Sequence, residues 1–283
     1  MGITKQELTE EATDKTKEMY VEFSVMLEEV IQKGLDIVVS LNESKVTGRE
    51  EKQQQIMISI LKEILEKIDG IIILSEKYSQ QNISVLARSV LDGFLDLNFM
   101  LKAPKRALAY IYCKSLDYLS KYEKMELSAD DQEGIKSIQQ QLGDELKKQR
   151  GKKKESNDHR LNWKSFYFDE KTDDPYKSKG AKIHYSLLCA ETHNQGSIIH
   201  SYSEDNSFKL RGFRDTSKTE IGLISQIIAR FSGEIFDRMV KLYIREPSSN
   251  LEKWREEIFE KSEKLIKLDN ERLAGTTKLN AEI

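Results

Sequence analysis

The sequence predicts an all-α protein, an elongated antiparallel helical bundle with an irregular basic excursion in its middle. Three observations favour this fold class. Hydrophobic residues make up 38% of the chain and fall into stripes with helical period, although charged residues make up 33%. The 283 residues include only 3 prolines, and each lies where a helical pattern stops or starts. A chain of this length can bury a sizeable core of long helices.

The N-terminal part is predicted to contain two amphipathic helices and a shorter one. Apolar residues recur with helical spacing from about residue 5 to residue 33, and Gly34 is a common kind of helix stop. We predict a separate short helix over 35–41 and a loop over 42–48. A second long stripe predicts a helix over 49–78, which Gly70 weakens slightly without breaking.

The next two helices form the predicted centre of the bundle. Residues 79–82 are expected to form a turn, and the helix over 84–102 is apolar on most of its sides, which indicates the most buried helix. Pro104 suits the first turn of the helix that follows. Because the connections are short, these helices are expected to be antiparallel neighbours.

The composition changes after residue 125. A weaker helical pattern over 133–148 leads into Lys147–Lys154, where six of eight residues are basic. We expect an exposed excursion there and a short helix over 183–194. Apolar stripes then predict a long helix over 221–242 and a charged helix over 251–272, with a frayed end.

These elements divide the chain into four stretches. Residues 1–125 hold the N-terminal helices and the central hairpin, and 126–180 form the linker or excursion. Residues 181–247 form the C-terminal half of the core, and 248–283 form the terminal helix and tail.

The composition also restricts the function classes. The net charge of −3 comes from nearly balanced acids and bases, so a general polyanion binder is not expected. The polar start, the absence of an apolar run of about 18 residues and the two separated cysteines favour a soluble cytoplasmic protein without a membrane span. No metal or cofactor motif is found, so no cofactor is expected.

Arg88 and Asp92 are the first candidate site residues. They are four positions apart on the most apolar helix, so both side chains project from one face. A charge in such a segment is costly unless it is paired. The two residues therefore form either a structural ion pair, which composition favours, or the floor of a site.

A second cluster of candidates lies near the predicted helix over 183–194. Tyr185 and His193 share its face, and Asn194 and His200 follow. Two histidines can supply a general acid and a general base near neutral pH. Hydrogen-bonded helix ends are the alternative, and the spacing from His193 to His200 does not match that of a metal site.

Two basic spots could hold phosphate groups electrostatically. The first is Lys152, Lys153 and Lys154, and the second is Arg211 with Arg214 on either side of Phe213. A solvated loop explains the lysines equally well. The sequence has no phosphate-binding glycine loop, no dinucleotide fingerprint and no nucleophile elbow.

The segments SVLARSVLDGFLDLNFMLKAPKRALAY and YSLLCAETHNQ, with Trp163 between them, resemble the DUF5677 family of bacterial helical proteins. Arg88 and Ser89 match its Arg-Ser-x-x-Glu helix, with Asp92 in place of Glu, and Tyr185, Leu188 and His193 match its Tyr-x-x-Leu helix ending in His. The resemblance covers roughly the middle half of the chain. It implies a distant similarity to the HEPN superfamily of toxins and antiviral-defence ribonucleases. HEPN nucleases carry Arg and His close together on one helix, and this sequence has no such pair.

Two function classes stay open on these grounds. The first is a non-enzymatic helical module that binds a protein partner or senses a ligand in a defence or toxin–antitoxin complex, as a homo-oligomer. The second is a metal-independent endoribonuclease in which His193 moves the proton and Arg88, oriented by Asp92, stabilises phosphate charge. Asn194 and His200 would assist, and Tyr185 and the basic spots would bind the RNA.

Overall fold

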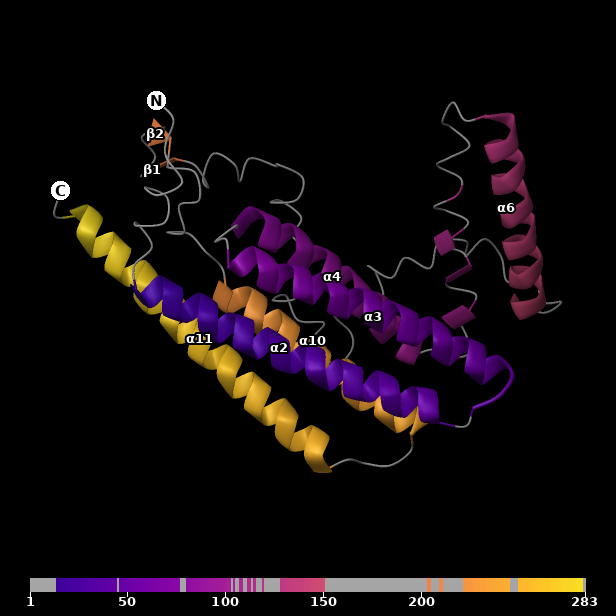
Figure 1. Cartoon of the computed structure of the whole chain (residues 1–283), viewed down its shortest axis with the longest axis horizontal. Coiled ribbons are helices and arrows are strands. Elements are labelled where there is room, and N and C mark those ends of the chain that lie inside the picture. The colour runs from indigo at the N-terminus through magenta and orange to yellow at the C-terminus, as the bar shows by residue number, and fades with distance from the viewer. Residues whose placement is uncertain are drawn as a thin grey trace, which may run out of the picture.

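The computed structural model is an all-α structure with one very short pair of strands (Figure 1). It describes residues 14–44, 46–76 and 80–102, single positions and pairs between 104 and 119, and residues 128–150, 203–204, 209–210, 221–244 and 249–281. The helices are α2 (Asp14–Glu43), α3 (Arg49–Ser75), α4 (Gln80–Lys102), α6 (Ala129–Arg150), α10 (Ile221–Tyr243) and α11 (Ser249–Ala281). The described positions between 104 and 119 are also helical.

The helices α2, α3, α4 and α10 form a closed ring of four packed neighbours. Each contacts the next, in the order α2, α3, α4, α10 and back to α2, and α11 packs over the junction of α2 with α10. Successive helices run antiparallel: Gln53 at the start of α3 lies against Pro104, just after the end of α4. In contrast, α4 and α10 are parallel neighbours, because Phe94 stacks on Phe231 and Asn98 bonds to Arg238. In Figure 1, α6 stands apart at one end of this bundle.

A single hydrophobic core joins the helices at the two ends of the chain. Its buried residues come from α2, α3, α4, α10 and α11. The rings of Phe94 and Phe231 stack with centroids 6.0 Å apart, and Phe236 stacks on Trp254 at 5.5 Å. The stretches 1–125, 181–247 and 248–283 predicted from the sequence therefore contribute to one core.

The prediction that the first helix ends before Gly34 is wrong. Helix α2 continues through Gly34 to Glu43 and includes the run over 35–41 that was expected to be separate. A Cβ at Gly34 would lie 2.6 Å from a methyl carbon of Leu65 and 3.2 Å from the ring of Phe236. The glycine thus permits close packing of α2 on α3 and α10, a role that the sequence pattern of one helix does not reveal.

Three other expectations are corrected in detail. Gln80 to Asn82 belong to α4 instead of a turn, and α6 and α11 are each longer than expected at both ends. Helix α10 is as central as α4, since only Arg230 and Lys241 are exposed along it. The antiparallel pair of β1 (Ser203–Glu204) and β2 (Lys209–Leu210) was not predicted.

Buried polar side chains stabilise one turn between helices and one contact between helices. The Gln54 side-chain amide donates to the Leu41 carbonyl at 3.0 Å and to the Ser44 hydroxyl at 2.6 Å, which holds the turn between α2 and α3. The Gly222 amide in the first turn of α10 donates to the buried Asp269 carboxylate of α11 at 3.0 Å. A carboxylate there satisfies an N–H that has no partner within the helix, and it interacts favourably with the helix dipole.

Tyr243 at the end of α10 is a buried phenol whose acidity the fold changes. Its hydroxyl donates to the Met57 sulfur at 3.4 Å. Burial, with a smaller contribution from the negative charge of Glu50, raises the pKa of Tyr243 to about 12. The folded protein therefore favours the neutral phenol.

None of the helices in the described part of the chain is long and apolar enough to cross a membrane.

Candidate functional site

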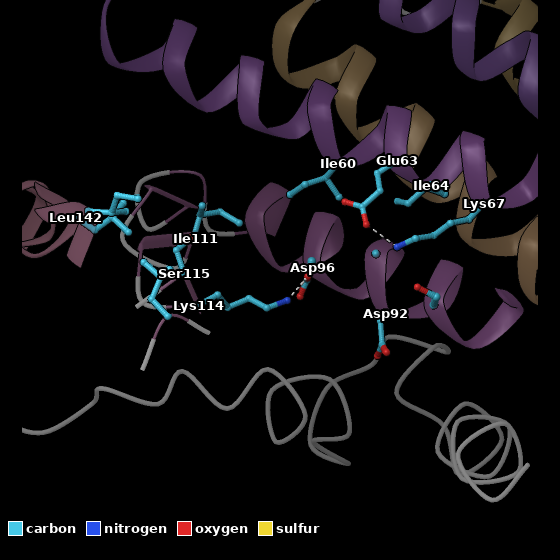
Figure 2. Close-up of a pocket in the computed structure, with 14 residues that line it drawn as sticks. Ile60, Glu63, Ile64, Lys67, Asp92, Asp96, Ile111, Lys114, Ser115 and Leu142 are labelled. Atoms are coloured by element: carbon cyan, nitrogen blue, oxygen red, sulfur yellow. Dashed lines mark hydrogen bonds and ion pairs between the residues drawn. The ribbon is translucent and has the colours of Figure 1, made fainter. Parts of the chain in front are cut away.

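A groove of about 650 Å³ is lined by residues of α3, α4 and α6 and by Ile111, Lys114, Ser115 and Leu119 (Figure 2). Six large apolar residues line it: Ile60, Ile64, Ile111, Leu119, Ile138 and Leu142. Five charged residues line it as well: Glu63, Lys67, Asp92, Asp96 and Lys114. We call the six apolar residues the floor of the groove and the five charged residues its rim.

Each carboxylate of this rim has a cationic partner. Lys67 bonds to Glu63 one turn earlier on α3, at 2.6 Å. Figure 2 shows this pair and, below it, Lys114 reaching across to Asp96 of α4. The third carboxylate, Asp92, pairs with Arg88. These contacts hold the rim side chains in defined positions.

The Arg88–Asp92 pair has the geometry that its four-residue spacing predicts. A guanidinium nitrogen of Arg88 lies 3.2 Å from a carboxylate oxygen of Asp92. The arginine side chain is only 11% exposed, whereas that of Asp92 is 41% exposed and lines the groove. Asp92 therefore meets solvent and Arg88 supports it from beneath.

Gly93 explains why the groove carboxylates lie so near α3. A Cβ at this position would be 2.6 Å from a side-chain carbon of Ile64. Helices α3 and α4 consequently approach closely at this level, and Asp92 and Asp96, which flank Gly93 in the sequence, line the same groove as Glu63 and Lys67.

Helices α4 and α10 share a second polar cluster, which the sequence analysis missed. Arg238 donates to the side-chain oxygen of buried Asn98 at 3.0 Å and forms an ion pair with Glu234 one turn earlier. The signal was available in part, because Glu234 and Arg238 are four apart in an apolar helix, as Arg88 and Asp92 are. Asn98 gave no signal, since its partner is 140 positions away.

Most of the predicted site residues lie outside the described residues. These are Lys152, Lys153, Lys154, Tyr185, His193, Asn194, His200, Arg211 and Arg214. Of the predicted set, the structure brings together Arg88 and Asp92. That Arg88 and His193 share a site stays a prediction. Among the described residues, no three His, Cys, Asp or Glu side chains form a group that could hold a metal ion.

The protein is thus an all-α bundle. Its candidate site among the described residues is the groove, which is lined by apolar and charged side chains. A family model described as a family of unknown function, DUF5677, matches residues 54–210, which is more than half of the chain. The protein belongs to the DUF5677 family. Every residue that lines the groove falls within the matched range, whereas α2, α10 and α11 lie outside it. Comparison with curated proteins and with solved structures gave no match.

Proposed function

We propose that this protein is a non-enzymatic helical module that binds a protein partner or senses a ligand through the groove, within a bacterial defence or toxin–antitoxin complex. The combination of an apolar floor with a rim of paired charges carries the proposal. The cellular setting follows from the resemblance to the HEPN superfamily.

The size and the lining of the groove support binding. A volume of about 650 Å³ lies within the range of roughly 300–1,000 Å³ that is typical of ligand pockets. Burial of apolar ligand surface on the isoleucine and leucine side chains supplies affinity. The rim carboxylates are already held in place by ion pairs with Arg88, Lys67 and Lys114. They can therefore orient a polar group of the ligand with little further loss of side-chain entropy.

The environment of Arg88 favours binding over phosphate chemistry. An arginine that stabilises a phosphate must reach it, and this side chain is mostly buried and engaged with Asp92. The Asp92 carboxylate also neutralises part of the positive charge that Arg88 could offer to a phosphate.

The test measures binding of the neutral apolar dye Nile red to the full chain by fluorescence. Ile138 on α6 lines the groove and is about half exposed, so Ile138→Glu introduces a charge without disturbing the core. We expect it to weaken dye binding by roughly tenfold or more. Ser115→Trp should have a similar effect by filling the groove without adding charge.

Ile73→Glu is the matched control, because Ile73 is also about half exposed and lies on α3 outside the groove. It should leave the affinity unchanged. If Ile138→Glu and Ser115→Trp both bind the dye like the wild type, the groove is not a ligand site and the proposal fails. It also fails if the wild type does not bind the dye.

A second candidate, which the burial of Arg88 makes the less favoured one, is a metal-independent endoribonuclease in which the Asp92 carboxylate would orient the Arg88 guanidinium. His193 would take the proton from a ribose 2′-hydroxyl, whose oxygen attacks the phosphorus while the bond to the 5′ oxygen breaks. His200 would protonate that leaving oxygen. Arg88 would stabilise the phosphate charge, and Asn194 would assist.

Incubation with total RNA in EDTA separates the two candidates. Intact RNA at high protein concentration agrees with the binding module. Cleavage that His193→Ala abolishes would favour the nuclease, because a contaminating enzyme would cleave equally in both preparations.

A further inference from the structure

Helix α2 has two apolar faces. One packs into the core through residues such as Phe23, Val30 and Leu41. On the opposite side, exposed residues follow each other at alternating spacings of four and three: Val21, Val25, Glu28, Gln32, Leu35 and Val39. The four apolar members are 62%, 45%, 43% and 56% exposed, in chain order. We call these six residues the outer stripe of α2.

The outer stripe differs from the outer faces of the neighbouring helices. From 250 to 271, every exposed residue of α11 is polar, and all but the two asparagines are charged. On α3, Ile73 is the single apolar residue among the exposed ones. Helix α2 alone among these three exposes a run of apolar side chains along its length, which is typical of a contact surface.

The order of residues along the stripe is symmetric about position 30. If a second α2 packs antiparallel about that point, Val21 meets Val39 of the other copy, and Val25 meets its Leu35. Glu28 then meets Gln32 at both central layers. Alternating spacings of four and three are those of a helix pair that interlocks side chains, and the antiparallel arrangement pairs apolar with apolar and polar with polar at every layer.

The central polar layers are chemically matched as well. The Gln32 side-chain amide has two N–H donors, and one of them is bonded to Asp36 at 2.9 Å. The second can donate to the Glu28 carboxylate of the other copy. On one flank of the stripe, Glu22 and Glu29 form ion pairs with Lys264 and Lys261 of α11, so their charges are already balanced within one copy.

We propose that the outer stripe of α2 binds a second copy of this chain as an antiparallel, two-fold symmetric helix pair. This inference does not depend on the groove, which lies against α3 and α4. The stripe from residue 21 to residue 39 is about 27 Å long at roughly 1.5 Å per residue. A contact of that length and one helix wide is smaller than the standard interface of about 800 Å² per partner, so the dimer is weak and depends on concentration.

The experiment is sedimentation equilibrium of the full chain from about 1 to about 500 µM. We expect the mass to rise from 32.8 kDa toward twice that value. Val25→Lys and Leu35→Glu should each weaken self-association by at least roughly tenfold, because each places a charge opposite an apolar side chain. Both positions are exposed and both new residues favour helix, so circular dichroism should remain unchanged.

The combination of Val25→Lys with Leu35→Glu tests the register. In the antiparallel pair, each new ammonium meets a new carboxylate of the other copy, so self-association should recover. Ile73→Lys is the matched control and should behave like the wild type, because Ile73 is about half exposed, as Val25 and Leu35 are, but lies on another helix.

Three results would overturn the proposal. The first is a monomer at all concentrations. The second is self-association that Val25→Lys and Leu35→Glu leave unchanged, since the contact would then lie elsewhere. The third is a double variant as dissociated as the single ones, because a parallel pair would place like charges opposite each other.

Discussion

Replacement of Gly222 by alanine tests how closely α10 packs on α11. An added Cβ would lie 2.8 Å from the main-chain Cα of Ile266 and 3.3 Å from the Cβ of Asp269. A main-chain atom cannot rotate away, so α11 must move, and we place the overpacking cost near the top of the usual range of about 1–3 kcal/mol. The same movement weakens the bond from the Gly222 amide to Asp269, at about 1 kcal/mol. The higher helix propensity of alanine returns about 1 kcal/mol, which leaves a net loss of about 2–3 kcal/mol.

Gly233→Ala is the matched control on the same pair of helices. There the added Cβ would meet Cγ of Arg255, 2.6 Å away, but this side chain is exposed and flexible and can turn aside. We expect that variant to be neutral or slightly stabilised. In urea unfolding with an m value of about 3 kcal/mol/M, Gly222→Ala should lower the midpoint by about 0.7–1 M. Equal midpoints for the two variants would refute the close approach of the α10 and α11 backbones.

Three further predictions concern the core and the site. Alkaline titrations of the wild type and of Tyr243→Phe differ by the phenolate absorbance of Tyr243. The midpoint of this difference should lie near pH 12. Because the folded pKa exceeds the unfolded value of about 10, wild-type stability should fall by roughly 2–3 kcal/mol between pH 10 and 12, and the variant should lack this loss. Phe94→Ala should lower the free energy of unfolding, measured with heat or urea, by about 3–5 kcal/mol, because the ring is fully buried and stacks on Phe231. A loss below about 1 kcal/mol would mean that this ring is not packed. A double-mutant cycle of Arg88→Met and Asp92→Ala should give a coupling free energy of about 1 kcal/mol. This exceeds the value for an exposed pair because the arginine is largely buried. If the two losses of stability simply add, the ion pair is contradicted.

The sequence predicted those parts of the fold that depend on local periodicity. The helices predicted over 49–78 and 221–242 follow directly from stripes of isoleucine and other large apolar residues. The structure confirms both helices, with bounds of Arg49–Ser75 and Ile221–Tyr243. The prediction of a helix end at Gly34 was wrong because glycine occurs in two kinds of position. It often ends helices, and it also lies where two helices approach closely. Only the positions of Leu65 and Phe236 decide between them, and both are far along the chain.

The same division applies to the site. The Arg88–Asp92 contact could be predicted because both residues lie on one helix. The Lys114–Asp96 pair links separate segments, and the groove also needs residues of α6, so no spacing in the sequence indicates them. Helical period determines which face of a helix is apolar, but not which other helix covers it.

Because α2 and α10 complete the ring that α3 and α4 begin, the family-matched stretch 54–210 covers only part of the packed core. It ends before α10 begins and starts after α2 has finished, so an excised fragment would keep two sides of the ring and lose the other two. Phe94, now fully buried, would lose the ring of Phe231 on which it stacks. The matched stretch is therefore shorter than the packed core, and recombinant work on this protein should include the flanking helices.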